Sequence, residues 1–498
     1  MNKQELIDAY EEFEMKYSAY YLAMATMEWD ISTTSPKNGK PYAAMRMGVL
    51  QGEAFAAMID PKNLKMLNDL AAIEDLDPLT KRSVTARLKD LAGMQLVPPD
   101  RYTYFEQTKH LANHIWEQAK AENNYKLFEP HLLKVIELTK EYYSYYPKKD
   151  ELYDWMLDDY ERDMTTKDYD AFFDLIKEKL VPFIKKVVAA KQIDTSFLHK
   201  EYDPIKQRQF MDTIMSYIHY NLDAGMIAVS VHPFTCGLSI NDVRITTRYN
   251  THDVASGILS TIHELGHATC MGQFDPKYDG SYIAHCVTSG IHESQSRLLE
   301  NYLGRSKSFW IPNYPALQAL FPENLNSVPL DDFVAAINAS MPSLIRTEAD
   351  ELTYPLHILI RYELEKAIFR DQVDLSKLDQ IWADKYEEYL GIRPDSDATG
   401  ILQDVHWSQG SFGYFPTYAL GTAYAAQFMK AMRSDLDVDS LLANSQMPVI
   451  KDWLKEKIHQ YAGLYTPKET LVRVTGEAFN PQYYIDYLLD KFSKLYHI

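Results

Sequence analysis

The sequence is poor in the features that mark secreted and membrane proteins. It holds three cysteines in 498 residues, Cys236, Cys270 and Cys286, and such a small, odd number argues against a disulfide framework and favours a reducing compartment. We find no apolar run of about 18 residues, the length that a membrane-spanning helix needs. The opening residues 1–8 also lack the apolar core of a signal peptide. These absences predict a cytoplasmic protein that does not enter a membrane.

A surplus of positive charge is also missing. The chain has 51 Lys and Arg against 70 Asp and Glu, a net charge of −19, whereas a protein that binds nucleic acid presents a basic face to the phosphates. Nucleic acid is therefore not an expected partner. We also find no Gly/Ser-rich linker, no low-complexity run and no repeat. We therefore expect residues 1–498 to form one catalytic domain with lobes on either side of a cleft.

Helical periodicity dominates what is present. Apolar residues recur at helical spacing, and we expect helices at 1–30, 42–58, 168–192 and 204–221, with two or three more in 447–498. The exception is a pair of stretches rich in β-branched residues, 226–231 and 239–249, which flank the turn-like residues 232–237. This pattern predicts a β-hairpin. Its edge could either bind an extended peptide through main-chain hydrogen bonds or serve as a structural ribbon.

One short motif directly after this hairpin carries chemistry. Residues His263–His267 read HELGH, the pattern H-E-x-x-H, within a helix expected at 252–274. Positions i and i+4 lie on one face of a helix, so His263 and His267 can bind one metal ion while Glu264 accepts a proton from water. Zinc suits imidazole ligands and keeps one position open for water. The expected fold class is thus all-α, with a small hairpin next to a metal-binding helix.

A zinc site with two histidines needs a third protein ligand, which we expect on the next helix, at about 288–303. Glu293 lies 26 residues beyond His267, which leaves room for a loop and an antiparallel return. His292 adjoins Glu293 but points about 100° away around the helix, so the two cannot both bind the ion. We favour Glu293 as the ligand. His292 then lies close to the ligands or faces the substrate, and His285 packs.

With these residues the chain resembles the carboxypeptidase Taq family of zinc metallocarboxypeptidases. Six short motifs match those of the family in the same order, and further landmarks extend the likeness over essentially the whole chain. The motifs are HPF (His232–Phe234), DVRIT (Asp242–Thr246), HELGH (His263–His267), HESQ (His292–Gln295), IRTEAD (Ile345–Asp350) and GILQDVHW (Gly400–Trp407).

The resemblance implies a helical fold with a long, deep groove and a short sheet at the metal. It also implies a homodimer that releases single residues from the free C-termini of peptides with broad specificity, proline being poorly released. One Zn²⁺ per chain is the implied cofactor, with Co²⁺ as a possible substitute. In this scheme Glu264 acts as the general base toward the attacking water. Asp350 and Asp404 are candidates to orient a zinc-bound imidazole.

A carboxypeptidase must also recognise a free carboxylate, and a guanidinium suits this because it can bond both oxygens. Arg346, in the IRTEAD motif, is the candidate. The alternative is a surface arginine paired with Glu348 or Asp350. Arg244 is a second candidate, closing one end of the groove, and its alternative is a strand arginine on a solvated face.

The oxyanion that develops during the attack needs a further hydrogen-bond donor. The resemblance favours Tyr418, because related zinc peptidases use a tyrosine after the last motif. Tyr414 lies one helical turn away and is an alternative, and packing is an alternative role for either ring. His232 and His406 are candidates to hold substrate carbonyls, or else partly buried histidines with structural hydrogen bonds.

Two other functions are open to such a sequence. A helical zinc oligopeptidase that cuts internally or removes dipeptides would share the H-E-x-x-H motif, the following glutamate and the late tyrosine. The motif Ile345–Asp350 and the cluster Gln403–Trp407 argue against it. The other is a peptide-binding scaffold with a degenerate site, against which the intact metal motif and Glu293 argue.

Overall fold

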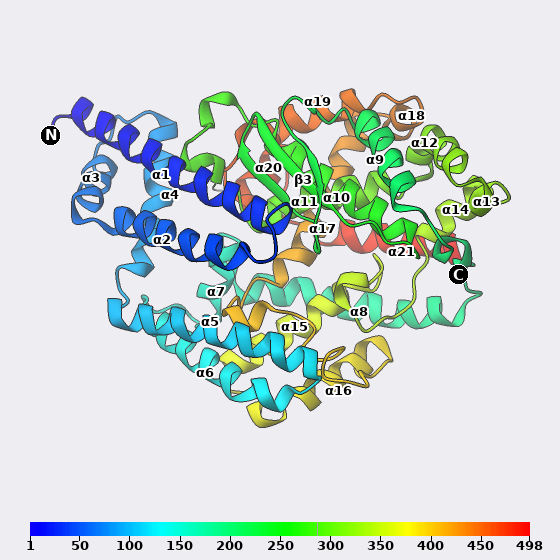
Figure 1. Ribbon diagram of the computed structural model, residues 1–498, viewed down its shortest axis with the longest axis horizontal. Helices are drawn as coiled ribbons and strands as arrows, with labels where there is room; N and C mark the ends of the chain where they lie inside the picture. Colours follow the sequence, from blue (N-terminus) through cyan, green and yellow to red (C-terminus); the bar gives the residue numbers. More distant parts are fainter. Residues whose placement is uncertain (286) are drawn as a thin grey trace. The chain divides into compact units, whose positions relative to one another are not determined.

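The computed structural model describes residues 1–285 and 287–498, so Cys286 lies outside the described residues. These residues form two compact units, each assembled from three separate segments of the chain (Figure 1). Unit 1 comprises Met1–Gln95, Asp194–Ile337 and Phe428–Ala478, and unit 2 comprises Leu96–Ile193, Asn338–Gln427 and Phe479–Ile498. The expectation of one catalytic domain stays a prediction.

Unit 1 contains the sheet and the helix that carries the HELGH motif. Its elements are α1 (Lys3–Ser32), α2 (Lys40–Ile59), α3 (Pro61–Ala71), α4 (Pro78–Met94), η1 (Ser196–His199), α9 (Pro204–Ile218), β1 (Ile227–Val229), β2 (Thr235–Ser239), β3 (Asp242–Thr247), α10 (Val254–Met271), η2 (Pro276–Tyr278), η3 (Tyr282–His285), α11 (Ser289–Arg297), the π-helical η4 (Leu298–Gly304), α12 (Lys307–Leu320), α13 (Pro322–Leu325), α14 (Leu330–Ile337), α18 (Val438–Ala443), α19 (Met447–Lys457), η8 (His459–Tyr461) and α20 (Pro467–Thr475).

Among the described residues, the regular secondary structure of unit 2 is entirely helical. Its elements are α5 (Pro99–Glu122), α6 (Tyr125–Ser144), α7 (Tyr153–Tyr160), α8 (Thr166–Ala189), η5 (Arg346–Glu348), α15 (Tyr354–Phe369), η6 (Leu375–Lys377), α16 (Leu378–Leu390), η7 (His406–Gln409) and α21 (Gln482–Tyr496). The boundary between the units falls within α17 (Pro416–Asp435). The all-α class with one small sheet is therefore confirmed, and three helices follow residue 447 as expected. The groove remains a prediction.

The sheet differs from the expected hairpin. Its strand order is β1-β3-β2. β1 runs parallel to β3, and the antiparallel partner is β2, whose first three residues were expected to belong to the turn. Gly237 was interpreted as a turn signal, but it lies inside β2, where a Cβ would collide with the Met271 side chain of α10. The glycine thus leaves room for the Met271 side chain where β2 packs on α10.

The central helix of unit 1, α10, is buried on almost every side, against β3, α9, α11 and η4. A helix that is apolar around most of its circumference gains stability from such packing. Ile258, Ile262 and Leu265 are almost completely buried, and each stabilises the fold by roughly 2 kcal/mol. The first turn is capped by Asp253, whose carboxylate accepts a hydrogen bond from the Ser256 amide at 3.0 Å. The HELGH residues therefore lie on a rigid element.

The core of unit 2 contains an aromatic cluster from α7, α8 and α15. The rings of Phe173 and Tyr362 lie 4.6 Å apart between centroids, and those of Tyr153 and Phe369 lie 5.8 Å apart. Rings at such separations contribute packing energy beyond their buried area. This cluster holds α15 in place, and α15 carries several charged groups discussed below.

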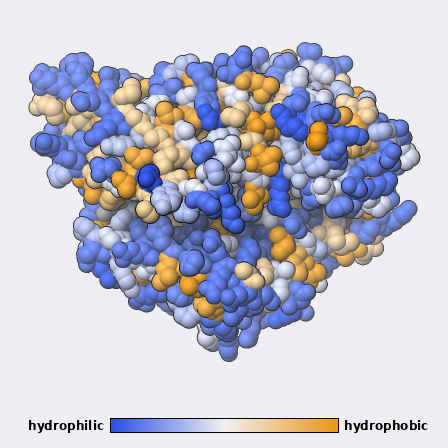
Figure 2. Space-filling view, viewed as in Figure 1, coloured by the Kyte–Doolittle hydropathy of each residue, from blue (hydrophilic) through white to orange (hydrophobic). Residues whose placement is uncertain are grey.

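The surface of unit 1 includes an apolar helix. In α2, all of which is described, Ala54 is the one buried side chain, while Tyr42, Met45 and Val49 are largely exposed. Figure 2 shows pale to orange side chains gathered over the region of α1 and α2. Among the described residues, none of the helices has the length and apolarity needed to cross a membrane.

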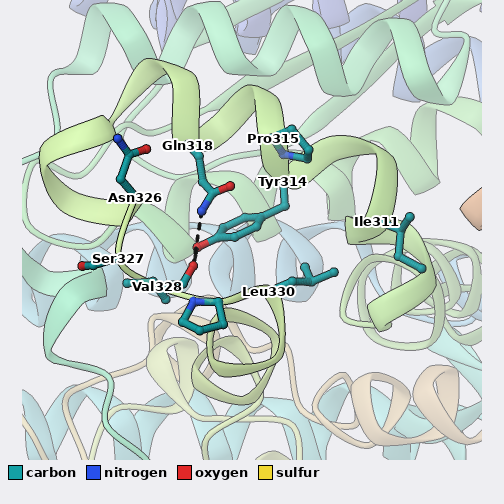
Figure 3. Close-up of a pocket in the computed structure, with 9 residues that line it drawn as sticks. Ile311, Tyr314, Pro315, Gln318, Asn326, Ser327, Val328 and Leu330 are labelled. Atoms are coloured by element: carbon teal, nitrogen blue, oxygen red, sulfur yellow. Dashed lines mark hydrogen bonds between the residues drawn. The ribbon is translucent and has the colours of Figure 1, made fainter.

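Unit 1 also holds a cavity of about 350 Å³ between α12 and the segment that leads to α14 (Figure 3). Tyr314 and Gln318 point across it and donate hydrogen bonds to the Val328 carbonyl at 2.9 and 3.2 Å. No ionisable acid, base or metal-ligating side chain other than the Tyr314 phenol lines this cavity. This cavity is therefore not a candidate catalytic site.

Buried histidines predict that acid destabilises the fold. Burial lowers the pKa of His285 and His406 to about 4 and that of His459 to about 3. Between about pH 4 and 6.5 the unfolded chain therefore binds more protons than the folded chain, so stability falls as the pH falls through this window. Burial also holds the pKa of His292 and His357 well below the ordinary value. Burial raises the pKa of the Glu14, Asp350 and Glu365 carboxyls, that of Glu365 to about 7, and nearby glutamates raise the pKa of His263. These four groups act in the opposite direction, but five imidazoles outweigh them.

We expect a net loss of roughly 2 kcal/mol per pH unit near pH 5.5, measured by urea unfolding of chelator-treated protein so that metal release does not contribute. His285 packs on the Tyr21 ring at 4.3 Å between centroids, so His285→Phe should keep the packing and reduce the slope by one imidazole. A stability that is constant or rises on acidification would contradict this explanation.

Candidate metal centre and active site

Three side chains from two adjacent helices of unit 1 converge on one point. His263 and His267 project from α10 and Glu293 from α11, and their ligand atoms all lie within 4.8 Å of one another. Glu293 Oε2 is 3.6 Å from His263 Nε2 and 3.5 Å from His267 Nε2. The three residues are those that the sequence analysis selected as metal ligands.

The arrangement fits a small tetrahedral cation. Nitrogen and oxygen ligands at 2.0–2.2 Å from such an ion lie about 3.3–3.5 Å from one another, close to the observed separations. Among the described residues these three form the one group of His, Cys, Asp or Glu side chains with metal-site geometry. The chemistry of the donors also fits, because two imidazoles with one carboxylate leave one tetrahedral position for water.

A second carboxylate orients one of the imidazoles. Glu300, in η4, contacts His263 Nδ1 at 2.9 Å, which makes Nδ1 the protonated nitrogen and directs the lone pair of Nε2 toward the ion. Arg297 bonds both carboxylates, Glu293 at 2.7 Å and Glu300 at 3.2 Å, and Arg305 bonds Glu300 at 3.2 Å. The two glutamates are thus fixed by Arg297, which lies between them in the sequence, and by Arg305, which directly follows η4.

Electrostatics in this group favour a bound cation. Burial opposes ionisation of Glu293 and Glu300, but Arg297 and the neighbouring imidazoles hold the pKa of both carboxyls well below the usual range. Burial likewise disfavours a charged His263, yet Glu293 and Glu300 raise its pKa. With both imidazoles neutral, as metal ligands must be, the carboxylates of Glu264, Glu293 and Glu300 exceed the two arginines by one negative charge, which attracts a divalent ion.

Glu264 is held beside the ligands by the sheet. The residue is 6% exposed, and its Oε2 accepts a hydrogen bond from the Thr235 hydroxyl of β2 at 2.6 Å. The same hydroxyl lies 3.1 Å from the Glu264 carbonyl oxygen. A second link joins the sheet to α10 through the hydroxyls of Thr247 and Thr261, 2.7 Å apart. These hydrogen bonds show that the sheet positions the Glu264 carboxylate.

The neighbouring histidines have structural contacts. His292 stacks on His267 at 4.1 Å between ring centroids, and burial lowers its pKa well below the ordinary value. It therefore lies against a ligand ring, as the sequence analysis allowed. His285 packs on Tyr21, as expected.

The residues proposed for substrate binding fall into two groups. Arg244 and His232 lie in unit 1, on or beside the sheet. Arg244 makes a two-point ion pair with Asp242, at 2.8 and 2.7 Å, and its guanidinium carbon lies 5.6 Å from the centre of the Trp29 ring. His232 is exposed, and its ring makes no hydrogen bond with the described residues, so it is not the partly buried histidine of the alternative interpretation.

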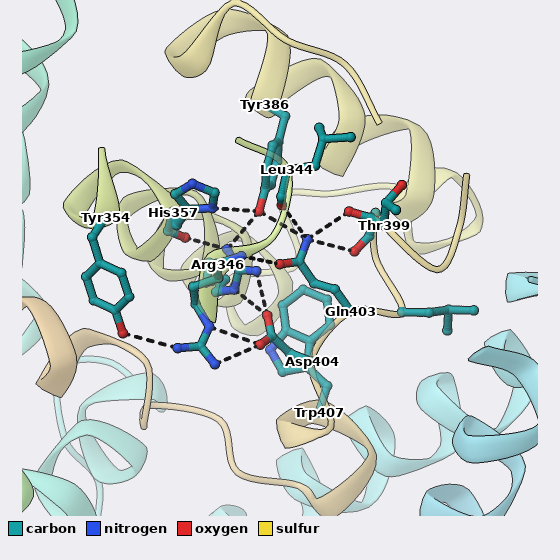
Figure 4. Close-up of polar contacts among 12 residues, drawn as sticks. Leu344, Arg346, Tyr354, His357, Tyr386, Thr399, Gln403, Asp404 and Trp407 are labelled. Carbon is teal, nitrogen blue, oxygen red and sulfur yellow. Dashed lines mark hydrogen bonds and ion pairs between the residues drawn. The ribbon is translucent and has the colours of Figure 1, made fainter. Parts of the chain in front are cut away.

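Arg346 lies in unit 2 within a buried polar cluster (Figure 4). Its partner is Asp404, not Glu348 or Asp350: Nε and Nη2 lie 3.0 and 2.9 Å from Asp404 Oδ1. Nη1 donates to the Tyr354 hydroxyl at 3.1 Å. A guanidinium has five N–H donors; one N–H on each terminal nitrogen therefore makes no hydrogen bond with the described residues.

His406, Tyr414 and Tyr418 gather next to this cluster. The His406 ring lies 5.5 Å from Tyr414 and 6.3 Å from Tyr418, the two tyrosines lie 5.1 Å apart, and the Arg346 guanidinium is 5.1 Å from the Tyr418 ring. Burial and the two nearby arginines outweigh Asp404 and lower the pKa of His406 to about 4. His406 is therefore neutral at pH 7.

A buried carboxyl anchors the loop that carries these side chains. Glu365 of α15 accepts hydrogen bonds from the Trp407 indole at 2.7 Å, the Gly413 amide at 2.8 Å and the Tyr153 hydroxyl at 2.6 Å. The loop between η7 and α17 is thus tied to the aromatic core of unit 2. Tyr414 and Tyr418 come shortly after Gly413 in the sequence, so their backbone is held close to this anchored residue.

The sequence analysis assigned the orientation of an imidazole to the wrong carboxylates. Asp350 accepts hydrogen bonds from the amides of Leu352 and Thr353 and closes its own turn, and Asp404 binds arginines, whereas Glu300 contacts His263. Glu300 lies seven residues after Glu293, two helical turns along the same face. That spacing could have identified Glu300 from the sequence as a residue close to the metal ligands. Thr235 and Arg361 had no comparable signal, because their roles depend on tertiary contacts.

The chain is similar to known metallopeptidases over almost its whole length. The family model of carboxypeptidase Taq (M32) metallopeptidases matches residues 9–492. The chain is 41% identical over 484 residues to "Carboxypeptidase 1" of Bacillus subtilis (strain 168), covering 97% of each chain. An M32 carboxypeptidase structure from Deinococcus radiodurans R1 matches with a TM-score of 0.96 at 31% identity, over 99% of this chain and 100% of that one. A Pyrococcus furiosus carboxypeptidase structure gives 0.95 at 33% identity, over 99% of each.

Glu300 should control metal affinity. In Glu300→Ala the acceptor for His263 Nδ1 is lost, so we expect metal affinity to fall about 10–100-fold, measured by competition with a chelator. Glu300→Gln should lose less, because its amide oxygen still accepts the hydrogen bond. Glu323→Gln, at an exposed position of α13, is the control. Equal affinity in Glu300→Ala and the parent protein would show that Glu300 does not support the metal ligands.

Proposed function

Because the chain belongs to the carboxypeptidase Taq (M32) family of metallopeptidases, we propose that it is a zinc-dependent enzyme that releases single C-terminal residues from peptides. Family membership places it among metallocarboxypeptidases, which are hydrolases acting on peptides. The observation that carries the finer proposal is the convergence of His263, His267 and Glu293 on one point. Their donor set is the reason to choose zinc, with one ion per chain and Co²⁺ as a possible substitute.

Glu264 is the proposed general base. When bound, the metal ion polarises the scissile carbonyl and brings the pKa of water to about 7. Glu264 Oε accepts the proton of the attacking water and later delivers it to the leaving amine. The hydrogen bond from Thr235 supports this role, because it keeps the carboxylate beside the ligands. It also leaves the other Glu264 oxygen available for water.

The developing oxyanion would receive a hydrogen bond from Tyr418, with Tyr414 as the alternative donor. The short distance between the two rings supports either choice. His406, neutral at pH 7, would donate or accept a hydrogen bond at a substrate carbonyl and would not act as an acid. His232 is proposed for a similar contact because its ring is exposed. Arg244 would close one end of the binding site, held there by Asp242.

Arg346 is the proposed anchor for the C-terminal carboxylate. Its two remaining N–H donors match the two oxygens of a carboxylate. Burial of the guanidinium supports this assignment, because an ion pair formed there is weakly screened by solvent. Such an anchor separates a carboxypeptidase from an oligopeptidase that cuts internally or removes dipeptides, the alternative function.

The remaining features of the proposal come from the family resemblance. They are broad specificity with proline disfavoured, a substrate groove and a homodimer. One catalytic domain over 1–498 and a cytoplasmic location are proposed from the sequence itself. The exposed apolar side chains of α2 support an interaction surface of the kind that a homodimer would cover. Neither nucleic acid nor a membrane is a proposed partner.

Mass spectrometry of one peptide, prepared as the free acid and as the C-terminal amide, tests the function. We expect a ladder of single C-terminal losses from the free acid and no ladder from the amide. A chelator should abolish the activity, and added Zn²⁺ should restore it. Internal cuts, or equal cleavage of both peptides, would overturn the carboxypeptidase assignment in favour of an oligopeptidase.

Substituting Glu264 tests the base. Glu264→Gln removes the proton acceptor but keeps the shape, so we expect kcat to fall by at least about 100-fold while metal content, measured by elemental analysis, stays at one ion per chain. Thr235→Val should lower kcat less, because it removes the bond that positions the base. Turnover retained by Glu264→Gln would remove Glu264 from this role.

A further inference from the structure

Asp404 is shared by two arginines, one on each carboxylate oxygen. Arg346 bonds Oδ1, as described above. Arg361 of α15 bonds Oδ2 through Nε at 2.7 Å and Nη2 at 2.5 Å. Figure 4 shows Asp404 in the middle of this network, with Arg346 on one side. Two guanidinium charges and one carboxylate leave the group with one positive charge in excess.

Arg361 has no route to a substrate. Its side chain is 0% exposed, compared with 7% for Arg346. It lies against the ring of Trp382, at 4.6 Å from the centroid, and Nη1 donates to the His357 carbonyl at 2.7 Å and the Tyr386 hydroxyl at 3.2 Å. Four of its five N–H donors are therefore used by the protein. Arg361 can influence a ligand only through Asp404 and its charge.

The other charged groups near the cluster do not cancel the excess. Lys120 donates to the Gln403 carbonyl at 2.8 Å and adds positive charge. Glu365 accepts hydrogen bonds from three neutral groups, as described above, and its carboxyl is partly protonated at pH 7 because burial raises its pKa to about 7. An anion that approaches Arg346 therefore meets a net positive group.

We propose that Arg361 is a positioning residue for carboxylate recognition: it fixes Asp404 and balances its charge, so that Arg346 meets the substrate's C-terminal carboxylate as an uncompensated cation. This inference rests on the anchor role given to Arg346 in the proposed function. Without Arg361, Asp404 and Arg346 would form a neutral pair, and the anchor would lose its attraction for an anion while keeping its hydrogen-bond donors. Arg361 would then set the preference for free acids over amides from a position that the substrate never touches.

Binding measurements separate charge from structure. An N-blocked dipeptide and its C-terminal amide are titrated calorimetrically into metal-loaded protein carrying Glu264→Gln, which prevents turnover. We expect Arg361→Met to reduce the preference for the free acid at least about tenfold, equivalent to 1.4 kcal/mol, with little change for the amide. Arg361→Lys keeps the charge and should retain most of the preference.

The deciding variant removes both charges. Arg361→Met combined with Asp404→Asn leaves Arg346 with its full charge and should restore the preference for the free acid. A purely structural role of Arg361 predicts the opposite, because the double variant loses more contacts than the single one. Arg393→Met is the control: this exposed arginine of unit 2 also bonds two carboxylates, Asp384 and Glu387, at 2.7 and 2.8 Å, and its loss should change neither affinity.

The possible results are distinct. If Arg346→Met keeps the preference, the anchor assignment fails, and this inference fails with it. If Arg346→Met abolishes the preference but Arg361→Met keeps it, or the folded double variant does not restore it, only the role of Arg361 is overturned. Should Arg361→Met fail to fold, Arg361→Lys and the double variant still decide: a preference retained in both supports the inference, and its absence from either overturns it.

Discussion

The close approach of α10 and α11 is the constraint on which the metal centre depends. A Cβ at Gly266 would lie 2.6 Å from the Gln295 carbonyl oxygen and the Ser296 Cα, closer than packed atoms allow. With glycine there, the helices come near enough for Glu293 Oε2 to lie 3.5 and 3.6 Å from the two imidazoles. A larger residue would separate the ligand atoms beyond the reach of one ion. Gly266, inside the HELGH motif, therefore allows the close helix packing that brings Glu293 next to the two histidines.

The two charged groups of the protein follow one principle with opposite signs. In unit 1, Arg297 bonds two carboxylates, Glu293 and Glu300, and the group with Glu264 and Arg305 carries one excess negative charge. In unit 2, Asp404 bonds two arginines and the group carries one excess positive charge. Full pairing would stabilise buried charges better. An unpaired excess is instead suited to a ligand of the opposite sign, a metal cation in one group and a carboxylate in the other.

Features encoded by short spacings were predictable. The i, i+4 histidines, Glu293 on the next helix and the boundaries of the long helices all follow from local periodicity, and the structure has them where expected. Features that depend on tertiary contact were not. The first residues of strand β2 were interpreted as a turn because Gly237 is a turn signal in isolation, and its packing against the Met271 side chain is seen only in the tertiary structure. Thr235, which contacts Glu264, was hidden by the same error.

In the proposed function, the preference for a free C-terminus depends on the contacts of Arg346 with its neighbours more than on its motif. An arginine in a matching motif is not yet an anchor, because Arg346 is already bonded to Asp404, and a neutral pair attracts an anion weakly. At about 4 Å and an effective dielectric constant near 20, a full charge attracts a carboxylate by about 4 kcal/mol before desolvation, and a compensated charge by far less. In our proposal this difference is supplied by Arg361, a residue outside every recognised motif. Carboxylate recognition would then be a property of the three-charge group, and its members must be evaluated together.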